Sequence, residues 1–454
     1  RTSYFQAKYL TRLAKQATFR LEPGPSPLIR FPRTGPYDLR YGYALLPSFI
    51  ERLKELKFRV SAQARISTQH AKFVDAGIFP IFHEKSQAGL KVTDRRAEPL
   101  LIYRTPEVVF KKFEDIPKIV LDTLLFIEDR NLLDESRPHH NPAIDWERLG
   151  KAVWELVVSK VGYDRNVPGG STLATQTEKF RHSPEGITGK PLEKLRQMGS
   201  ASLRAYLDGE ENIAARRRIV LDYINSVPLA AVPGYGEVHG LGDGLSAYYG
   251  RDINEISRLL RAEFTEQDPV NLARQAVAFW QVLSLFLAHR RPSDYLGNSP
   301  QTLVDQIAVY LPLLHRMGII PRALYETASN ANSRIRHTLP HAAPVSFTER
   351  KGLNLVRTHL LTALGLNSLY DLDRLDLSVT STLDARAQRE VTKILSGLRD
   401  AEYARSAGLE GFRMLDRTGD ASKVIYSFTL WERTEKANML RVQTDNLDQP
   451  LDIN

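Results

Sequence analysis

Apolar residues recur three and four positions apart through the middle of the chain, from about residue 116 to residue 331. This spacing predicts helices that bury one face. The expected helices are Ile116–Leu133, Asp145–Gly162, Ala214–Asn225 and Val277–His289, with more between Leu303 and Ala331. Pro117 and Gly162 fit a helix start and a helix end, respectively. The pattern therefore predicts a compact, all-helical globule.

Alternating and β-branched segments flank this region on both sides. Near the start of the chain, Ala44–Phe58 has helical spacing, whereas Arg59–Ser67 and Pro99–Arg104 indicate strands. The Pro- and Gly-rich segment Arg20–Asp38 predicts an extended linker. In the tail, Leu375–Leu383 and Val424–Glu432 indicate strands around a helix at Ala385–Leu398.

We therefore expect a mainly α protein with small α+β modules at both ends. The predicted domains are an entry module at 1–105, a helical domain at 106–300, a helical extension at 301–345 and an α+β tail at 346–454. The tail ends in a polar segment without a closing element, so we expect that domain to be incomplete.

Net charge and composition limit the kinds of partner and site that the chain can have. The chain of 454 residues has a net charge of +9 and no cysteine, which excludes disulfides and thiolate metal sites. Residues 1–35 carry seven Lys or Arg against one Glu. Such a segment is typical of a juxtamembrane stretch or of a solvated tail. The sequence contains no run of about 18 apolar residues, so we expect no transmembrane helix. No signal peptide pattern or initiating Met is present, so the chain reads as an excised or processed piece.

Glu128 and Asp129 follow an apolar helix and precede a polar loop. A carboxylate at that place is either a general acid or base, or an ordinary solvated helix end. His139, His140 and Asp145 lie in the same loop, but adjacent histidines rarely bind one ion well, so we expect no metal site there.

The stretch from Val167 to Phe180 contains two glycines before Ser171 and Thr172. A Gly-Gly turn lets backbone N–H groups approach an anion, and the following helix start favours negative charge. The alternative is a plain loop with an N-cap at Ser171 or Thr172. Gln176 and Lys179 lie on one helical face. Farther on, basic side chains either bind phosphate or form a solvated face; they are Lys194, Arg196, Arg204 and Arg216–Arg218.

In order and spacing, these pieces resemble the peptidoglycan glycosyltransferases, the lysozyme-like polymerase domain of bifunctional penicillin-binding proteins. Glu128-Asp129 matches the family's first motif, and Gly169 to Lys179 its Gly-Gly-Ser-Thr motif with Gln and Lys. Glu193–Gln197 corresponds best to the third, Arg-Lys-x-x-Glu. The helix with Arg216, Tyr223 and Asn225 matches the fourth. The similarity runs from about Tyr103 to Ala331, and includes Gly240–Asp252 and His289–Leu296.

Val379–Val391 resembles the segment that opens the family's transpeptidase module. No Ser-x-x-Lys follows it, so we expect the chain to stop short of the penicillin-binding serine. Within the polymerase region, Gln197 stands where the family has Glu, Glu193 where it has Arg, and Asn141 where it has His. Glu193 and Gln197 share a helix face, so Glu193 is a candidate for a relocated catalytic carboxylate.

The resemblance implies polymerisation of lipid II, with Glu128 as general base and release of undecaprenyl pyrophosphate. It assigns catalytic roles to Glu128 and Glu193, and substrate binding to Asp129, Gly170, Ser171, Thr172, Gln176, Lys179, Lys194, Arg196, Gln197, Tyr223 and Asn225. No cofactor is required, although a divalent metal ion such as magnesium is compatible with a pyrophosphate leaving group. The implied location is the extracytoplasmic face of the cytoplasmic membrane, through an N-terminal anchor outside this chain.

The expected partners are lipid II, the nascent glycan strand, the membrane surface and other cell-wall synthesis proteins. Trp146 and Trp154 fit either the bilayer interface or core packing. The altered motifs keep open a catalytically impaired homologue that binds precursor or partner proteins as a scaffold. A lysozyme-like hydrolase is a second alternative. We expect no nucleic-acid partner, because the basic residues are dispersed.

Overall fold

The protein is described by a computed structural model that covers residues 3–144, 171–331, 333–335, 347–411, 414, 419–435 and 437–447. The chain divides into two compact units. The first comprises Arg1–Pro47, Arg59–Gln87 and Pro106–Pro340, and the second Ser48–Phe58, Ala88–Thr105 and His341–Asn454. Residues 1–105 thus contribute to both units, although the sequence groups them as one module.

The first unit is built on a helical core. Its helices are α5 (Lys118–Glu128), α7 (Leu173–His182), α8 (Pro191–Ala205), α9 (Ile213–Ser226), α10 (Gly240–Tyr249), α11 (Ile253–Arg261), α12 (Pro269–Ala288), α13 (Pro300–Arg316) and α14 (Arg322–Ser329). Short helical turns lie at Phe113–Asp115, Pro184–Gly186 and Asp294–Asn298. These helices confirm the predicted helical segments around residues 116–133, 214–225, 277–289 and 303–331. The predicted helix Asp145–Gly162, with Trp146 and Trp154, lies outside the described residues.

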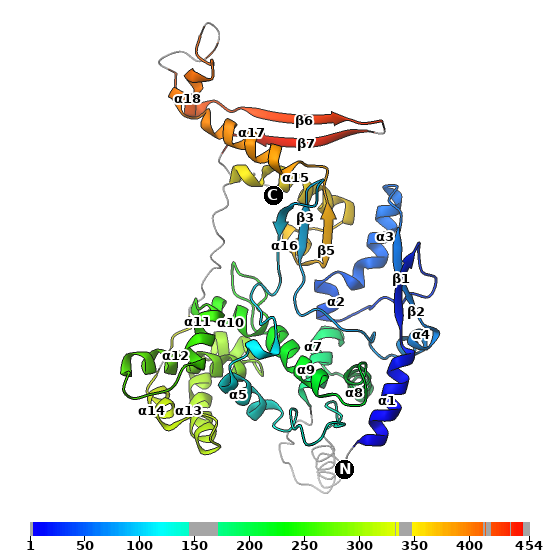
Figure 1. Cartoon of the computed structure of the whole chain (residues 1–454), viewed down its shortest axis with the longest axis vertical. Coiled ribbons are helices and arrows are strands. Elements are labelled where there is room, and N and C mark those ends of the chain that lie inside the picture. Colours follow the sequence, from blue (N-terminus) through cyan, green and yellow to red (C-terminus); the bar gives the residue numbers. More distant parts are fainter. Residues whose placement is uncertain are drawn as a thin grey trace. The chain divides into compact units, whose positions relative to one another are not determined.

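Helix α12 is the centre of this core. It packs against α5, α10, α11, α13 and α14 (Figure 1). Phe279, Val282 and Leu283 are fully buried in it. Among the residues that the structure describes, α12 alone is long and apolar enough to cross a membrane, and most of it is buried inside the unit. Its apolar character therefore has an explanation in core packing.

The N-terminal part of the chain packs on these helices. It contains α1 (Tyr4–Gln16), β1 (Phe19–Pro23), α2 (Pro36–Arg40), a 3-10 turn at Tyr43–Leu45, β2 (Ala62–Ile66) and α4 (Thr68–Asp75). Most of the intervening helix α3 (Leu46–Glu55) belongs to the second unit. Strands β1 and β2 pair antiparallel, with Leu21 opposite Ala64. The linker predicted over Arg20–Asp38 is therefore wrong at both ends, which lie in β1 and α2. The pairing of β1 with a distant strand is invisible to a local Pro and Gly signal.

The second unit is a small α+β assembly. It contains β3 (Leu90–Thr93), β4 (Pro99–Ile102), α15 (Phe347–Leu364), α16 (Leu369–Arg374), β5 (Leu377–Thr380), α17 (Ala385–Gly397), α18 (Ala401–Ser406), a 3-10 turn at Ala421–Lys423, β6 (Ser427–Arg433) and β7 (Asn438–Asp445). The central strand β3 pairs antiparallel with β4 and parallel with β5. Long-range pairing thus draws residues 88–105 to the tail. The mainly α fold class, with small α+β parts, is confirmed.

Candidate active site

Glu128 is the last residue of α5, and its side chain is only 7% exposed. The helix ends because Asp129 adopts an extended backbone, with φ −158° and ψ 84°. Val120 and Leu124 anchor the preceding turns in the core. The apolar helix thus places the Glu128 carboxylate in the protein interior, not at a solvated helix end.

Two side chains from other helices hold Glu128 in place. Gln176 of α7 donates a hydrogen bond from Nε2 to Glu128 Oε2 at 2.8 Å. Tyr223 of α9 donates its hydroxyl hydrogen to Gln176 Oε1 at 3.4 Å. Since Oε1 accepts from tyrosine, the amide must present its NH₂ group to the carboxylate. Burial, and then the nearby Glu128, raise the pKa of Tyr223 well above its usual value, which keeps it a donor.

The start of α7 is capped as the sequence predicts. Thr172 is the N-cap: its hydroxyl accepts from the Thr175 N–H, and the Thr175 hydroxyl accepts from the Thr172 N–H. Ser171, just before the cap, accepts a hydrogen bond at 2.7 Å from Lys194 Nζ. Gly169 and Gly170 lie outside the described residues, so the anion-binding turn stays a prediction.

Lys179 and Lys194 bring two positive charges to this side of α7. Burial, and then repulsion from Lys179, lower the pKa of Lys194. Within the described parts of the chain, no carboxylate pairs with either lysine. Two like charges held together in this way favour an anionic ligand. Arg196 points elsewhere, because its Nε would lie 2.6 Å from a Cβ built on Gly77.

Glu193 and Gln197 have structural partners on α8. Glu193 Oε2 accepts from the backbone N–H groups of Gly189 and Lys190, which caps the helix. Gln197 is fully buried and donates to the hydroxyls of Ser183 and Thr188. No hydrogen bond or ion pair in the described residues joins Glu193 to Glu128. The catalytic role of Glu193 and the substrate-binding role of Gln197 stay predictions.

Asn225 acts as a clamp between α9 and the backbone of Phe110. Its Oδ1 accepts from the Phe110 N–H at 2.9 Å, and its Nδ2 donates to the Phe110 carbonyl at 2.8 Å. The same loop lies against the Gly-rich helix α10, where a Cβ on Gly242 would lie 2.2 Å from the Val108 carbonyl oxygen. Asn225 thus joins α9 to the segment that leads into α5.

The polar loop after Glu128 is tied to the helices behind it. Arg216, fully buried in α9, donates to the carbonyls of Leu132, Asp134 and Arg137. Asn141 donates to the Ser202 hydroxyl and accepts from the Ala143 N–H. Arg216 is therefore neither a phosphate ligand nor part of a solvated face, the two alternatives that its basic neighbourhood suggests.

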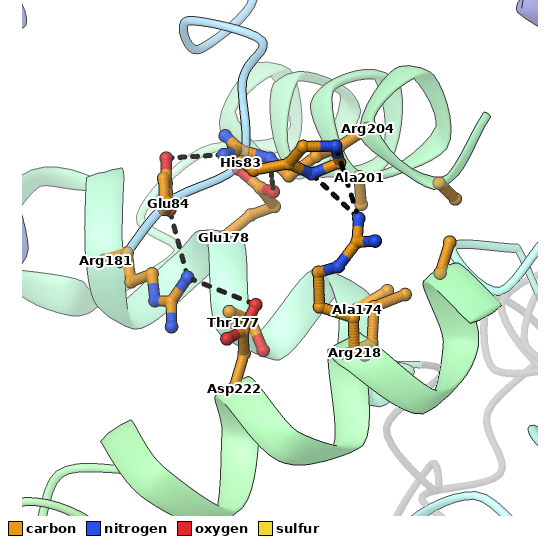
Figure 2. Close-up of a pocket in the computed structure, with 13 residues that line it drawn as sticks. His83, Glu84, Ala174, Thr177, Glu178, Arg181, Ala201, Arg204, Arg218 and Asp222 are labelled. Atoms are coloured by element: carbon orange, nitrogen blue, oxygen red, sulfur yellow. Dashed lines mark hydrogen bonds and ion pairs between the residues drawn. The ribbon is translucent and has the colours of Figure 1, made fainter. Parts of the chain in front are cut away.

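The opposite face of α7 is buried in a network of charges that the sequence did not reveal. Figure 2 shows Arg181 between Glu84 and Asp222, with N···O distances of 3.0 and 3.9 Å. Glu84 also meets Arg204 at 2.5 Å and His182 at 2.7 Å. These contacts tie α7 and α8 to the N-terminal segment, so the Arg204 side chain, 16% exposed, is paired with carboxylates rather than solvated. The network lines a cavity of about 40 Å³.

This network favours the charged forms of Glu84 and His182 despite burial. Burial opposes the charge on Glu84, but Arg204, His182 and Arg181 outweigh it and lower the pKa of that carboxyl. Burial likewise disfavours a charged His182, yet Glu84 and Asp38 raise its pKa to about 10. A helix fixed by such pairs has one face free to present Gln176 and Lys179. No motif marks Glu84, since its partners come from elements far apart in sequence.

His289 and Arg290 complete the surroundings of Glu128, and sequence reasoning missed both. His289 Nε2 lies 3.3 Å from Glu128 Oε1, and Arg290 lies 3.7 Å from the same oxygen. Both follow α12 and open the segment His289–Leu296, whose Pro-Ser-x-Tyr sequence resembles the family; that resemblance was the available signal. In the described residues, no group of three or more His, Asp or Glu side chains is arranged to hold a metal ion.

Residues 101–284 match the family model described as Transglycosylase. This part of the chain is a peptidoglycan glycosyltransferase domain, with the mainly helical, lysozyme-like fold of that family. The match contains Glu128, the start of α7 and Asn225. No curated protein matches the chain.

Proposed function

We propose that the chain polymerises lipid II into glycan strands and releases undecaprenyl pyrophosphate, with Glu128 as general base. The single observation that carries this proposal is the buried Glu128 carboxylate, held by Gln176 and, through it, by Tyr223. A base fixed in this way can take the proton from the 4-hydroxyl of the acceptor sugar. The hydroxyl oxygen then attacks the anomeric carbon of the lipid-linked donor from the side opposite the pyrophosphate, so the configuration inverts.

The leaving pyrophosphate needs positive charge, and Lys179 and Lys194 are the proposed source. Lys194 donates to Ser171 at the start of α7, where the helix dipole also favours an anion, and Lys179 from the last turn of the helix is near enough to lower the pKa of Lys194 after burial. The turn at Gly170 is a further candidate for the same anion, whereas Arg196 points toward Gly77. We propose that no cofactor is required; a divalent ion such as magnesium would enter with the pyrophosphate.

The reaction would take place at the extracytoplasmic membrane surface. Helix α1 supports this proposal, because its outer face exposes Phe5 (85%) and Tyr9 (62%) next to the exposed cations Lys8 and Arg12. Aromatic and basic side chains together suit a lipid headgroup region. Other cell-wall synthesis proteins remain candidate partners.

A gel assay with labelled lipid II tests the proposal against the scaffold alternative. The polymerase account predicts a ladder of glycan chains and free undecaprenyl pyrophosphate. Retention of lipid II without any chain formation would support a scaffold instead. Release of soluble fragments from purified cell walls would support a hydrolase.

A further inference from the structure

His289 meets the proposed base from the side opposite Gln176. It directly follows α12, and its side chain is 12% exposed, compared with 7% for Glu128. Gln176 binds Oε2 of the carboxylate, whereas His289 Nε2 lies 3.3 Å from Oε1. The mechanism proposed above gives this imidazole no role.

The other ring nitrogen determines what His289 can do. His289 Nδ1 lies 2.5 Å from the carbonyl oxygen of Phe286. A carbonyl only accepts hydrogen bonds, so Nδ1 must carry a hydrogen. A neutral imidazole has one N–H, and Nε2 therefore turns a lone pair toward Glu128. Two lone-pair atoms then face each other, and the contact becomes favourable once a single proton lies between them.

Burial, helped by two nearby cations, keeps that proton off the ring at rest. Lys179 of α7 and Arg290 disfavour an imidazolium, and the Tyr223 ring of α9 stands edge-on with its centroid 6.1 Å away. Burial is the largest effect and lowers the pKa of His289, while Glu128 opposes it. The resting pair is therefore a carboxylate beside a neutral imidazole, ready to receive one proton.

We propose that His289 receives the proton that Glu128 removes from the acceptor hydroxyl. This inference rests on the proposed function. The acceptor oxygen bonds to the anomeric carbon while the bond from that carbon to the pyrophosphate oxygen breaks, and its electron pair leaves with the pyrophosphate. The hydroxyl proton passes to Glu128 and on to His289 Nε2, and finally to water. Because His289 acts through Glu128, it is a positioning residue.

The pH profile of kcat tests this role in the intact chain, with wild type, His289→Gln and His315→Gln. His315 is the matched control: its Nδ1 lies 3.2 Å from the Ile320 carbonyl and its ring stacks on Tyr325, without a carboxylate contact in the described residues. In wild type, a proton that already occupies His289 at acidic pH blocks the transfer, so activity falls on the acid side. His289→Gln should lower kcat about tenfold, less than a general base contributes, and move the acid limb to lower pH. An unchanged acid limb in His289→Gln would overturn the proposal.

NMR titration of the His289 ring needs no substrate, and it tests the proposal even if His289→Gln folds poorly. In ring-labelled wild type, the His289 signal is assigned by its through-space contact with the Tyr223 ring, whose centroid lies 6.1 Å away. It should titrate at a higher pH than in Glu128→Gln, because removal of the carboxylate leaves only the cations around the ring. Equal titration in both proteins would overturn the proposal even if activity is never seen. A wild type that makes no glycan, with the NMR shift intact, would contradict the proposed function while the coupling between Glu128 and His289 stands.

Discussion

Replacement of Arg181 by Met tests whether the buried charges fix α7. The Arg181 side chain is 3% exposed and meets Glu84, which is 2% exposed, while a second bond runs to the Ser226 hydroxyl. Removal of one partner from a buried ion pair costs about 3–5 kcal/mol. Glu84 keeps Arg204 and His182, so we expect about 3 kcal/mol, the lower end of that range.

The loss should depend on pH in a defined direction. Burial already raises the pKa of Asp222, and Arg181 opposes that rise. Without Arg181 the Asp222 carboxyl takes up a proton more readily, which removes an uncompensated charge. The destabilisation should therefore be smaller at acidic than at neutral pH.

Urea unfolding, followed by fluorescence of the buried Trp280, measures this loss in a background in which Trp146, Trp154 and Trp431 are replaced by Phe. Arg217→Met is the control, because its pair with Glu135 is exposed, at 44% and 72%. That variant should lose at most about 1 kcal/mol. A loss for Arg181→Met no larger than the control, or one independent of pH, would refute the reasoning.

Three further predictions concern the clamp, the cations and the network. Asn225→Ala leaves the buried N–H and C=O of Phe110 without their partner, so unfolding should become easier by about 2–5 kcal/mol in thermal or urea melts. Lys194→Met removes one charge-assisted contact of about 1.5–3 kcal/mol, so kcat/KM for lipid II should fall about tenfold to a hundredfold and depend less on salt; an unchanged value would argue against the pyrophosphate site. His182 has a pKa raised to about 10, so its contribution is complete below its unfolded pKa of about 6.5 and is lost as pH rises toward 10. Stability of His182→Gln should accordingly fall less between those pH values than stability of wild type.

Local patterns predicted the helices that carry the site. The periodicity of residues 116–133 and 277–289 corresponds to α5 and α12, and Thr172 is the N-cap that its sequence context suggests. These features depend on neighbours within one or two turns, which a single sequence contains.

Long-range partners were not predictable in the same way. His289 meets Glu128 only because α12 and α5 pack together, and Arg181 meets Glu84 across the folded unit. Basic side chains such as Arg204 and Arg216 are usually solvated, so composition favoured the wrong surroundings for both. Strands β3 and β5 are likewise paired by tertiary structure, not by proximity in the chain.

Single-turnover polymerisation of lipid II by Glu128→Gln is the most direct test of the central claim. The amide keeps the size of the side chain and removes the base, so the rate should fall by at least about a hundredfold while the melting temperature stays near that of wild type. Glu135→Gln, an exposed carboxylate in the following loop, should polymerise like wild type. Glycan chains formed at the wild-type rate by folded Glu128→Gln would contradict the account.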